Sequence, residues 1–166
     1  AAFAAYPLRR LDAEVLIDAL NQITGTTEKY TSAIPEPFTF IPENSRAIAL
    51  PDGSITSSFL EMFGRPGRDT GLEAERNNRI TASQRLHLLN SSHVQRKLEQ
   101  GPKMQALLRT RAGPREMIDS LYLTILSRFP TDDERLAIAA HAKTTPDART
   151  AALVLAWALV NSAEFL

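Results

Sequence analysis

The sequence contains no cysteine among its 166 residues. This absence excludes from the chain every structure or reaction that needs a thiolate: disulfide bonds, cysteine zinc sites, thiol nucleophiles and covalent attachment of c-type haem. It does not indicate a cellular compartment, because a chain of this length can bury a core that needs no disulfides.

An excess of charge of either sign is also lacking. The 19 basic residues are balanced by 19 acidic ones, so the formal net charge is zero at neutral pH. Proteins that bind nucleic acids or anionic membranes broadly carry a basic excess. We therefore expect no nucleic-acid partner, although this composition still allows a local cluster of arginines.

Long apolar runs are missing as well. The most apolar run extends only from Ala151 to Val160, whereas a bilayer-spanning helix needs roughly 20 residues. The opening segment AAFAAYPL has no positively charged n-region, so we do not expect it to act as a signal peptide. We expect no membrane span, and we interpret the chain as a C-terminal fragment of a larger protein.

What the sequence does contain is helical periodicity. Apolar residues make up 43% of the chain and charged residues 23%, which is typical of a globular domain. Apolar positions follow a 3.6-residue period from residue 11 to residue 23, and Gly25 is a suitable stop for the helix that they predict. Glu14 and Asp18 fall on the polar face of this helix, which we interpret as exposed to solvent.

The region from Thr26 to Gly53 lacks this periodicity and holds four of the ten prolines. Proline restricts its own backbone and that of the residue before it, so the region is predicted to be irregular, extended or polyproline-like. Phe38 and Phe40 fall on one side of an extended chain and are predicted to pack this segment against the helical body. Contact with a ligand is the alternative, since long irregular connections are often functional.

The remaining sequence predicts further helices from their caps and periods. Ser54 is predicted to cap a short helix that ends at Gly64, and a Thr81–Gln84 capping box to open a helix that runs to about Gln100. A basic helix is predicted from Lys103 to about Thr110, and another from Pro114 to the stop at Pro130. A Thr131–Glu134 capping box opens a helix to about Ala142, and Thr145 and Pro146 begin the last helix. The fold class is therefore all-α, a single compact domain over residues 1–166 with about six or seven helices.

The helix that Thr81 opens is predicted to be central and buried. Its first half is apolar around nearly the whole circumference, which is typical of a helix enclosed by others. His87 and Asn90 then lie on the buried half and need hydrogen-bond partners. At uniform helical spacing, His87 and His93 do not point the same way.

A dense polar segment precedes and enters this helix. Five arginines (Arg65, Arg68, Arg76, Arg79 and Arg85) alternate there with Asp69, Glu73 and Glu75. One interpretation is a site for an anionic or polyhydroxyl ligand, in which arginine forks bind acidic groups and amides such as Asn78 and Gln84 bind hydroxyls. The other is that the charges pair among themselves and hold an irregular turn, which the near balance of signs favours.

Catalytic and metal sites have weaker support. His87, His93 and Glu75 could ligate a metal, but their spacing does not match a zincin helix, and we expect no metal. Glu61, Glu73 and Glu75 could provide paired carboxylates for glycoside hydrolysis, although neighbouring arginines lower a carboxyl pKa and so favour a nucleophile over a general acid. Serines lie near the histidines, but no G-x-S-x-G nucleophile elbow occurs.

Three blocks of sequence together resemble one known domain. The blocks are YPLRRLDAEVLIDAL, FGRPGR…ER…QRLHLLNSSHVQRKL and LYLTILSRFPTDDE…LAWALVNSAEFL. In this order they resemble the C-terminal domain of unknown function of large planctomycete-type secreted proteins. That resemblance implies an exported setting, periplasmic or at the cell surface, upstream domains in the same polypeptide, and often a cytochrome c-like domain. Haem would then belong to a separate upstream domain, with no cofactor in this chain.

The chain departs from the family pattern at one place. In the family that the chain resembles, many members carry a Cys-x-Cys pair just before the Glu-Arg that corresponds to Glu75 and Arg76, whereas Leu72 and Ala74 occupy those positions here. A thiol or metal role in relatives therefore does not transfer to this chain. The positions that match the family pattern are Arg65, Pro66, Arg68, Glu75, Arg76, Gln84, Leu89 and Asn90.

We accordingly predict a non-catalytic binding or docking module of a larger exported multidomain protein. Its partners are expected to be upstream domains of the same polypeptide, or an anionic or carbohydrate ligand. The candidate contact residues are Arg65, Arg68, Glu73, Glu75, Arg76, Asn78, Gln84, His87 and Asn90. The alternative is a polysaccharide-directed hydrolase, or its carbohydrate-binding part, that uses Glu73 or Glu75.

Overall fold

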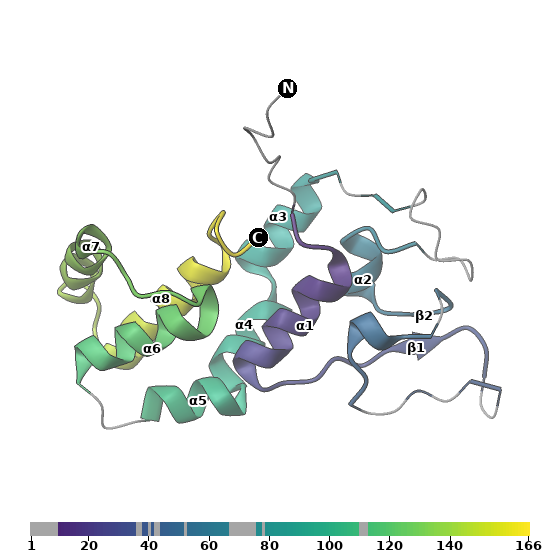
Figure 1. Cartoon of the computed structure of the whole chain (residues 1–166), viewed down its shortest axis with the longest axis horizontal. Coiled ribbons are helices and arrows are strands. Elements are labelled where there is room, and N and C mark those ends of the chain that lie inside the picture. The colour runs from purple at the N-terminus through teal and green to yellow at the C-terminus, as the bar shows by residue number, and fades with distance from the viewer. Residues whose placement is uncertain are drawn as a thin grey trace, which may run out of the picture. The chain divides into compact units, whose positions relative to one another are not determined.

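The computed structural model of the chain is mostly helical, which confirms the predicted fold class (Figure 1). It describes residues 10–35, 38, 39, 41, 44–51, 53–66, 76, 77, 79–109 and 113–166. Within them the elements are α1 (Ala13–Thr24), β1 (Thr31–Ser32), the 3₁₀ helix η1 (Ala47–Ala49), β2 (Ile55–Thr56), α2 (Ser58–Met62), α3 (Ala82–Asn90), α4 (Ser92–Gln100), α5 (Pro102–Arg109), α6 (Pro114–Leu126), α7 (Asp132–Ala142) and α8 (Ala148–Val160).

These elements form two compact units. Unit 1 comprises Ala1–Asp18 and Glu28–Ile80, and unit 2 comprises Ala19–Thr27 and Thr81–Leu166. Helix α1 therefore contributes its first half to unit 1 and its second half to unit 2. The predicted organisation as one domain stays a prediction.

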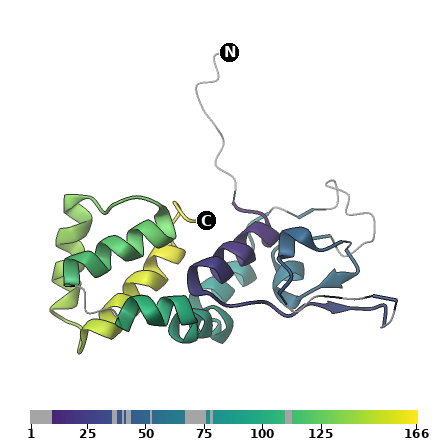
Figure 2. The same ribbon diagram turned by 60° about the horizontal axis from the view of Figure 1, so that its bottom comes forward.

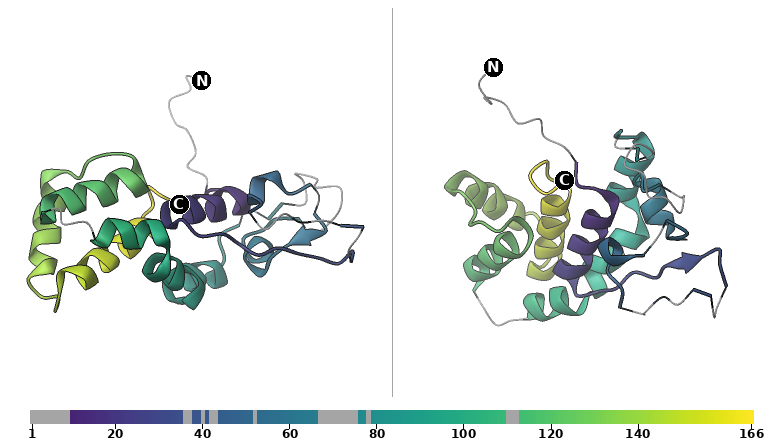
Figure 3. Two further views of the ribbon diagram at one scale, coloured as in Figure 1. Left: turned by 90° about the horizontal axis from the view of Figure 1, so that it is seen from below. Right: turned by 45° about the vertical axis from the view of Figure 1, so that its right-hand side comes forward.

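Unit 1 is built on α1, α2 and a small antiparallel sheet, whose two arrows are visible in Figure 3. Thr31 pairs with Thr56 and Ser32 with Ile55. The rings of Phe59 and Phe63 stack with centroids 4.2 Å apart and are fully buried. The core of this unit therefore lies where α2 meets the sheet and the first turns of α1.

The start of α2 differs from the prediction. Ile55 and Thr56 form strand β2 rather than the first turn of a helix, because β-branched residues favour an extended backbone and here find a pairing partner. The N-cap is consequently Ser57, whose hydroxyl oxygen accepts a hydrogen bond from the Leu60 N–H at 3.3 Å. Ser54, the predicted cap, precedes the strand.

The Pro-rich segment is largely irregular, as predicted, but Phe38 does not pack it in place. The side chain of Phe38 is 83% exposed. Instead, the buried residue of this segment is Ala47, the first residue of η1. Phe40 lies outside the described residues.

Unit 2 holds the second half of α1 and helices α3 to α8. Its core includes Leu20, Val94, Leu98, Leu121, Ala156 and Val160. Lys97 of α4 is buried and attaches this helix to the end of α1, where its ammonium donates to Asn21 Oδ1 at 2.7 Å and to the Thr27 carbonyl at 3.1 Å. Helices α6 and α8 pack closely, and α7 contacts α8.

The predicted central helix is in fact two helices that break at Ser91. The Ser91 backbone is extended, its N–H donates to the His87 carbonyl at 3.0 Å, and its hydroxyl oxygen accepts from the Val94 N–H at 3.3 Å. Serine side chains compete with the helical backbone for hydrogen bonds, so Ser91 ends α3 and caps α4. The prediction of a buried helix was wrong, because Leu86 is 58% exposed and Asn90 is exposed.

Most local helix signals are confirmed. The capping boxes at Thr81–Gln84 and Thr131–Glu134 are both present, and Pro114 occupies the first position of α6. Two ends differ. Helix α6 stops at Leu126, since Ser127 adopts a left-handed conformation with φ of 56°, and α8 begins after Asp147, whose carboxylate accepts from the Thr150 N–H at 2.9 Å.

Candidate functional site

The described part of the predicted polar site is organised by Glu14, in the first turn of α1. Arg76 donates to both of its carboxylate oxygens, at 2.7 and 3.0 Å, in a bidentate pair. Arg65 approaches the same carboxylate through Nε at 3.2 Å. One glutamate thus holds two of the predicted site arginines.

This Glu14–Arg65–Arg76 cluster is buried. The side chains of Glu14 and Arg65 are each 8% exposed, and that of Arg76 is 15% exposed. Burial alone would raise the pKa of Glu14, but the hydrogen bonds and charge of Arg76, with the charge of Arg65, outweigh it and lower the pKa below its ordinary value. Glu14 is therefore ionised and serves as the shared carboxylate of the two arginines.

Arg65 and Arg76 lie at the two ends of the polar segment, where Gly64 and Asn77 are hydrogen-bonded to each other. Asn77 N–H donates to the Gly64 carbonyl at 3.1 Å, and Arg65 Nη1 donates to the Ile55 carbonyl at 2.5 Å. Gly64 has a φ of 93°, and a Cβ at this position would lie 2.1 Å from the Asn77 carbonyl oxygen, so only glycine fits. The cluster therefore fastens both ends of the polar segment to α1 and β2.

Asp18 gives α1 a second buried carboxylate one turn later. Its two oxygens accept from the backbone N–H groups of Ala47, at 2.7 Å, and Ile48, at 3.2 Å. Arg46 Nε lies 3.4 Å from the same carboxylate. Asp18 thus caps η1 and holds the Pro-rich segment on the helix.

These contacts correct the interpretation of Glu14 and Asp18 as a solvated face, since both are buried. The sequence held one signal for them: arginines outnumber carboxylates in the polar segment, so buried arginines had to find an acidic partner elsewhere in the chain. An i, i+4 pair of carboxylates on one helix could supply it.

The other predicted site residues do not join this cluster. Arg68, Glu73, Glu75 and Asn78 lie outside the described residues. Gln84 is buried in unit 2, where its Oε1 accepts from the Thr81 N–H at 3.1 Å and completes a helix cap. His87 and Asn90 also belong to unit 2, so the predicted set divides between the two units.

The break at Ser91 brings two histidines together. His87 Nε2 and His93 Nδ1 are 3.4 Å apart, and the ring centroids are 5.6 Å apart. The prediction that these rings point apart was wrong, because it assumed a continuous helix. Within the described part of the chain, no three histidine, aspartate or glutamate side chains gather as metal ligands.

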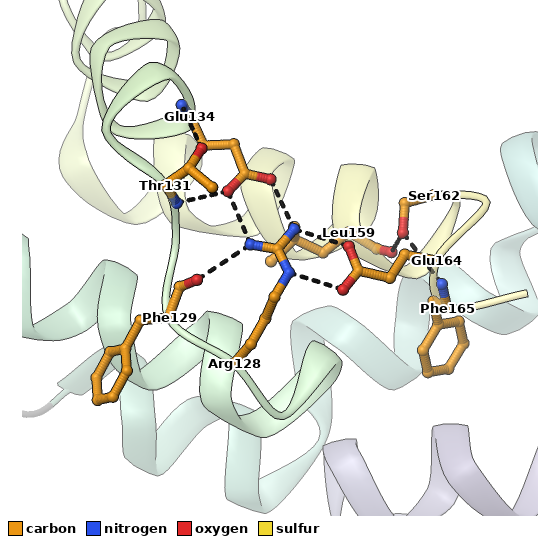
Figure 4. Close-up of polar contacts among 8 residues, drawn as sticks. All are labelled: Arg128, Phe129, Thr131, Glu134, Leu159, Ser162, Glu164 and Phe165. Carbon is orange, nitrogen blue, oxygen red and sulfur yellow. Dashed lines mark hydrogen bonds and ion pairs between the residues drawn. The ribbon is translucent and has the colours of Figure 1, made fainter.

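Unit 2 has a polar cluster of its own, around Arg128 (Figure 4). The guanidinium forms bidentate pairs with Glu134, at 2.8 Å for both bonds, and with Glu164, at 2.7 Å for both bonds. Hydrogen bonds from Arg128 lower the pKa of Glu134 to about 2. Arg128 thereby connects the end of α6, the start of α7 and the chain after α8.

A cavity of about 480 Å³ lies among α6, α7 and α8, the green and yellow helices of Figure 2. We call it the α6–α8 groove. It is lined by Pro114, Met117, Ile118, Leu121, Ala137, Ile138, His141, Ala142, Ala148, Ala151, Ala152, Val154, Leu155 and Ala158. The lining is almost wholly apolar, and sequence analysis missed it because its residues look like ordinary core positions.

A second cavity, of about 410 Å³, lies among α3, α4 and α8. We call it the Trp157 pocket. It is lined by Leu88, Leu89, Ser91, Gln95, Leu98, Glu99, Thr150, Leu153, Val154 and Trp157. The indole N–H of Trp157 donates to the Leu89 carbonyl at 3.3 Å, which fixes the ring in the lining.

Comparison with known proteins supplies the family. Among the described residues, no helix combines the length and apolar character of a membrane span. Neither the curated proteins nor the solved structures give a match to this chain. A family model does match, over residues 1–142, and its description is PSD1, protein of unknown function (DUF1553). The chain belongs to this family, which confirms the resemblance to a domain of unknown function.

Proposed function

We propose that this chain is a non-catalytic docking module of a larger exported multidomain protein. In this proposal the α6–α8 groove receives an amphipathic helix, acidic at one end, from a neighbouring domain of the same polypeptide. The exported setting, the planctomycete-type origin and a haem-bearing cytochrome c-like domain upstream rest on the sequence resemblance alone.

The observation that carries the proposal is that α7 has no buried residue. Helices in proteins gain most of their stability by packing an apolar face, yet among the α7 residues that line the groove Ala137 is exposed and Ile138 is only half-buried. Ion pairs hold the beginning of this helix, from Arg128 to Glu134 and from Arg135 to Asp119 at 2.7 Å. The later part of α7 borders the groove and still lacks a cover.

The lining of the groove suits a helix as its occupant. Six of the lining residues are alanines, which allow another backbone to come close. The larger residues Met117, Ile118 and Leu155 offer apolar surface between them. An amphipathic helix that lays its apolar face into such a groove is a common mode of recognition.

The charges at one end of the groove indicate which charged residues a bound helix should carry at that end. Arg115, Lys143 and Arg149 are exposed and each directly adjoins a lining residue, as do the acidic residues Glu116 and Asp147, so the cations are in slight excess there. None of the three forms a close ion pair with another described residue, and the carboxylate of Asp147, which is bonded to Thr150, also attracts Arg149. A partner with acidic residues at that end would meet a complementary surface.

The Glu14–Arg65–Arg76 cluster supports a non-catalytic role. A catalytic carboxylate must reach a substrate, and Glu14 is buried and held by two arginines. The hydrolase alternative depends on Glu73 or Glu75, which lie outside the described residues. It therefore stays a prediction from sequence.

The docking proposal can be tested with a designed amphipathic helical peptide that carries leucines on one face and glutamates at one end, labelled with a fluorophore. We expect binding with a dissociation constant in the micromolar range. Replacing the glutamates by lysines should weaken binding at least about tenfold, because the rim of the groove is cationic. Fluorescence anisotropy measures both constants.

Two variants locate the binding. Ala151→Arg places a long charged side chain in the groove and should abolish binding, while Ala163→Arg, at an exposed position outside the lining, should not. Circular dichroism checks that both fold, and Ile138→Glu serves as a second groove variant. Equal binding by Ala151→Arg and the unaltered chain, or no binding of the acidic peptide, would reject the proposal.

A further inference from the structure

We infer that the Trp157 pocket is a binding site for a neutral saccharide. This site is separate from the docking proposal, because it lies on α3, α4 and α8 and involves different polar groups. Only Val154 lines both cavities. The inference rests on the aromatic wall of the pocket, its row of polar atoms and its charge.

The aromatic wall is held in place before any ligand arrives. Trp157 lines the pocket, and its indole N–H is already bonded to the Leu89 carbonyl. The face of an indole carries negative quadrupole charge, which attracts the weakly positive C–H groups on one face of a sugar ring. A ring that is fixed in advance loses little conformational freedom when a ligand stacks on it.

The polar groups of the pocket come mainly from one face of α4. Gln95 Nε2 donates to Glu99 Oε1 at 2.9 Å, so these two side chains orient each other. Among the described residues, no group donates a hydrogen bond to Gln95 Oε1 or Glu99 Oε2. These two oxygens can accept hydrogen bonds from adjacent hydroxyls, the pattern that a sugar presents.

The remaining lining fits the same ligand. Leu88, Leu98 and Leu153 add apolar surface, and the lining also includes Ser91, whose hydroxyl oxygen caps α4. A volume of about 410 Å³ lies within the usual range for small-ligand pockets. An apolar wall with a few fixed polar groups is the general form of such sites.

The charge of the pocket decides between neutral and anionic sugars. Among the described residues that line the pocket, Glu99 is the one that carries a charge, and none is an arginine or lysine. A sulfate or uronate would approach the Glu99 carboxylate, and like charges at close range repel, while the nearby Arg96 and Arg149 lie outside the lining. The pocket therefore favours a neutral saccharide, in contrast to the anionic ligand that the arginine-rich segment suggested.

Trp157 is the only tryptophan in the chain, so its fluorescence reports on this pocket directly. We expect cellobiose, maltose or N,N′-diacetylchitobiose to change its emission in a saturable way, with a dissociation constant on the order of 1 mM. A disaccharide that contains glucuronic acid should bind at least about tenfold more weakly. Isothermal titration calorimetry gives an independent constant for each sugar.

Two variants keep the fluorophore and remove the acceptors. Glu99→Gln and Gln95→Ala should each raise the dissociation constant about tenfold, because each deletes or weakens a hydrogen bond to the sugar. Gln100→Ala is the matched control, since Gln100 is exposed on the same helix and does not line the pocket. Thermal unfolding followed by circular dichroism checks that all three remain folded.

Each outcome bears on the inference. Saturable binding of a neutral sugar that Gln100→Ala retains and Glu99→Gln weakens would support it. No change in emission with any of the three neutral disaccharides, unaltered affinity in both acceptor variants, or tighter binding of the glucuronate would overturn it. Binding of the acidic helical peptide is measured separately, so failure here leaves the docking proposal standing.

Discussion

At the scale of single residues, Glu14 explains how a dense set of arginines can be structural. A buried carboxylate between two guanidinium groups loses hydration, and that loss is offset only when the geometry of the hydrogen bonds is good. Here Arg76 provides a bidentate pair, and Arg65 adds a third contact. The arrangement specifies which segment packs on α1 more than it adds net stability.

Removing the charge of Glu14 should strongly destabilise the chain. Glu14→Gln removes the buried carboxylate charge that Arg65 and Arg76 share, so the free energy of unfolding should fall by about 3 kcal/mol. Urea unfolding followed by circular dichroism measures this change. Glu116→Gln, at an exposed position on α6, is the control and should change stability by less than about 0.5 kcal/mol.

The lowered pKa of Glu14 predicts a loss of stability in acid. Because the folded state holds Glu14 ionised more strongly than the unfolded state, its contribution is fully present above the ordinary glutamate pKa of about 4.3. It is lost as pH falls through the lowered value. Urea midpoints measured from pH 6 downward should therefore fall less steeply for Glu14→Gln than for the unaltered chain, and identical slopes would contradict the assignment.

At the scale of elements, the break between α3 and α4 rests on one serine. Ser91→Ala removes the hydroxyl that accepts from the Val94 N–H, so the free energy of unfolding should fall by about 1 kcal/mol. Ser92→Ala is the control, since Ser92 is exposed and lies within the first turn of α4. Thermal unfolding compares the two, and a larger loss for Ser92→Ala would show that the cap is elsewhere.

Elements that depend on neighbouring residues could be predicted from sequence. The two capping boxes join groups three positions apart, and Pro114 marks a helix start by its own geometry. The partner of Arg76 lies 62 residues away, and no local pattern links the two. The strand at Ile55 depends likewise on pairing with Ser32, so its sequence alone suggested a helix.

At the scale of the whole molecule, both compact units draw on α1. Leu16 and Ile17 are buried in the part of α1 that belongs to unit 1, and Leu20 and Thr24 in the part that belongs to unit 2. Gly101 shows how closely unit 2 packs around this helix, since a Cβ there would lie 2.5 Å from the Thr24 carbonyl oxygen. Neither unit therefore has a complete core without α1.

A fragment of residues 81–166 should accordingly be less stable than the same residues in the full chain. It lacks Asn21 and Thr27, and the buried ammonium of Lys97 would lose these acceptors. Adding a peptide of residues 12–27 should raise its melting temperature, while the same peptide with Leu20→Asp should not. A fragment as stable as the intact chain would show that α1 is dispensable for unit 2.

The hydrogen bond that joins the two ends of the polar segment has a consequence for the length of this segment in other members of the family. Because Gly64 and Asn77 are bonded to each other, and Arg65 and Arg76 both hold Glu14, residues between these points can change in number without moving the anchors. Lengthening a loop costs little entropy, about 0.6 kcal/mol for each doubling. The segment is thus a place where recombination could insert or exchange a peptide while the helices around it keep their packing.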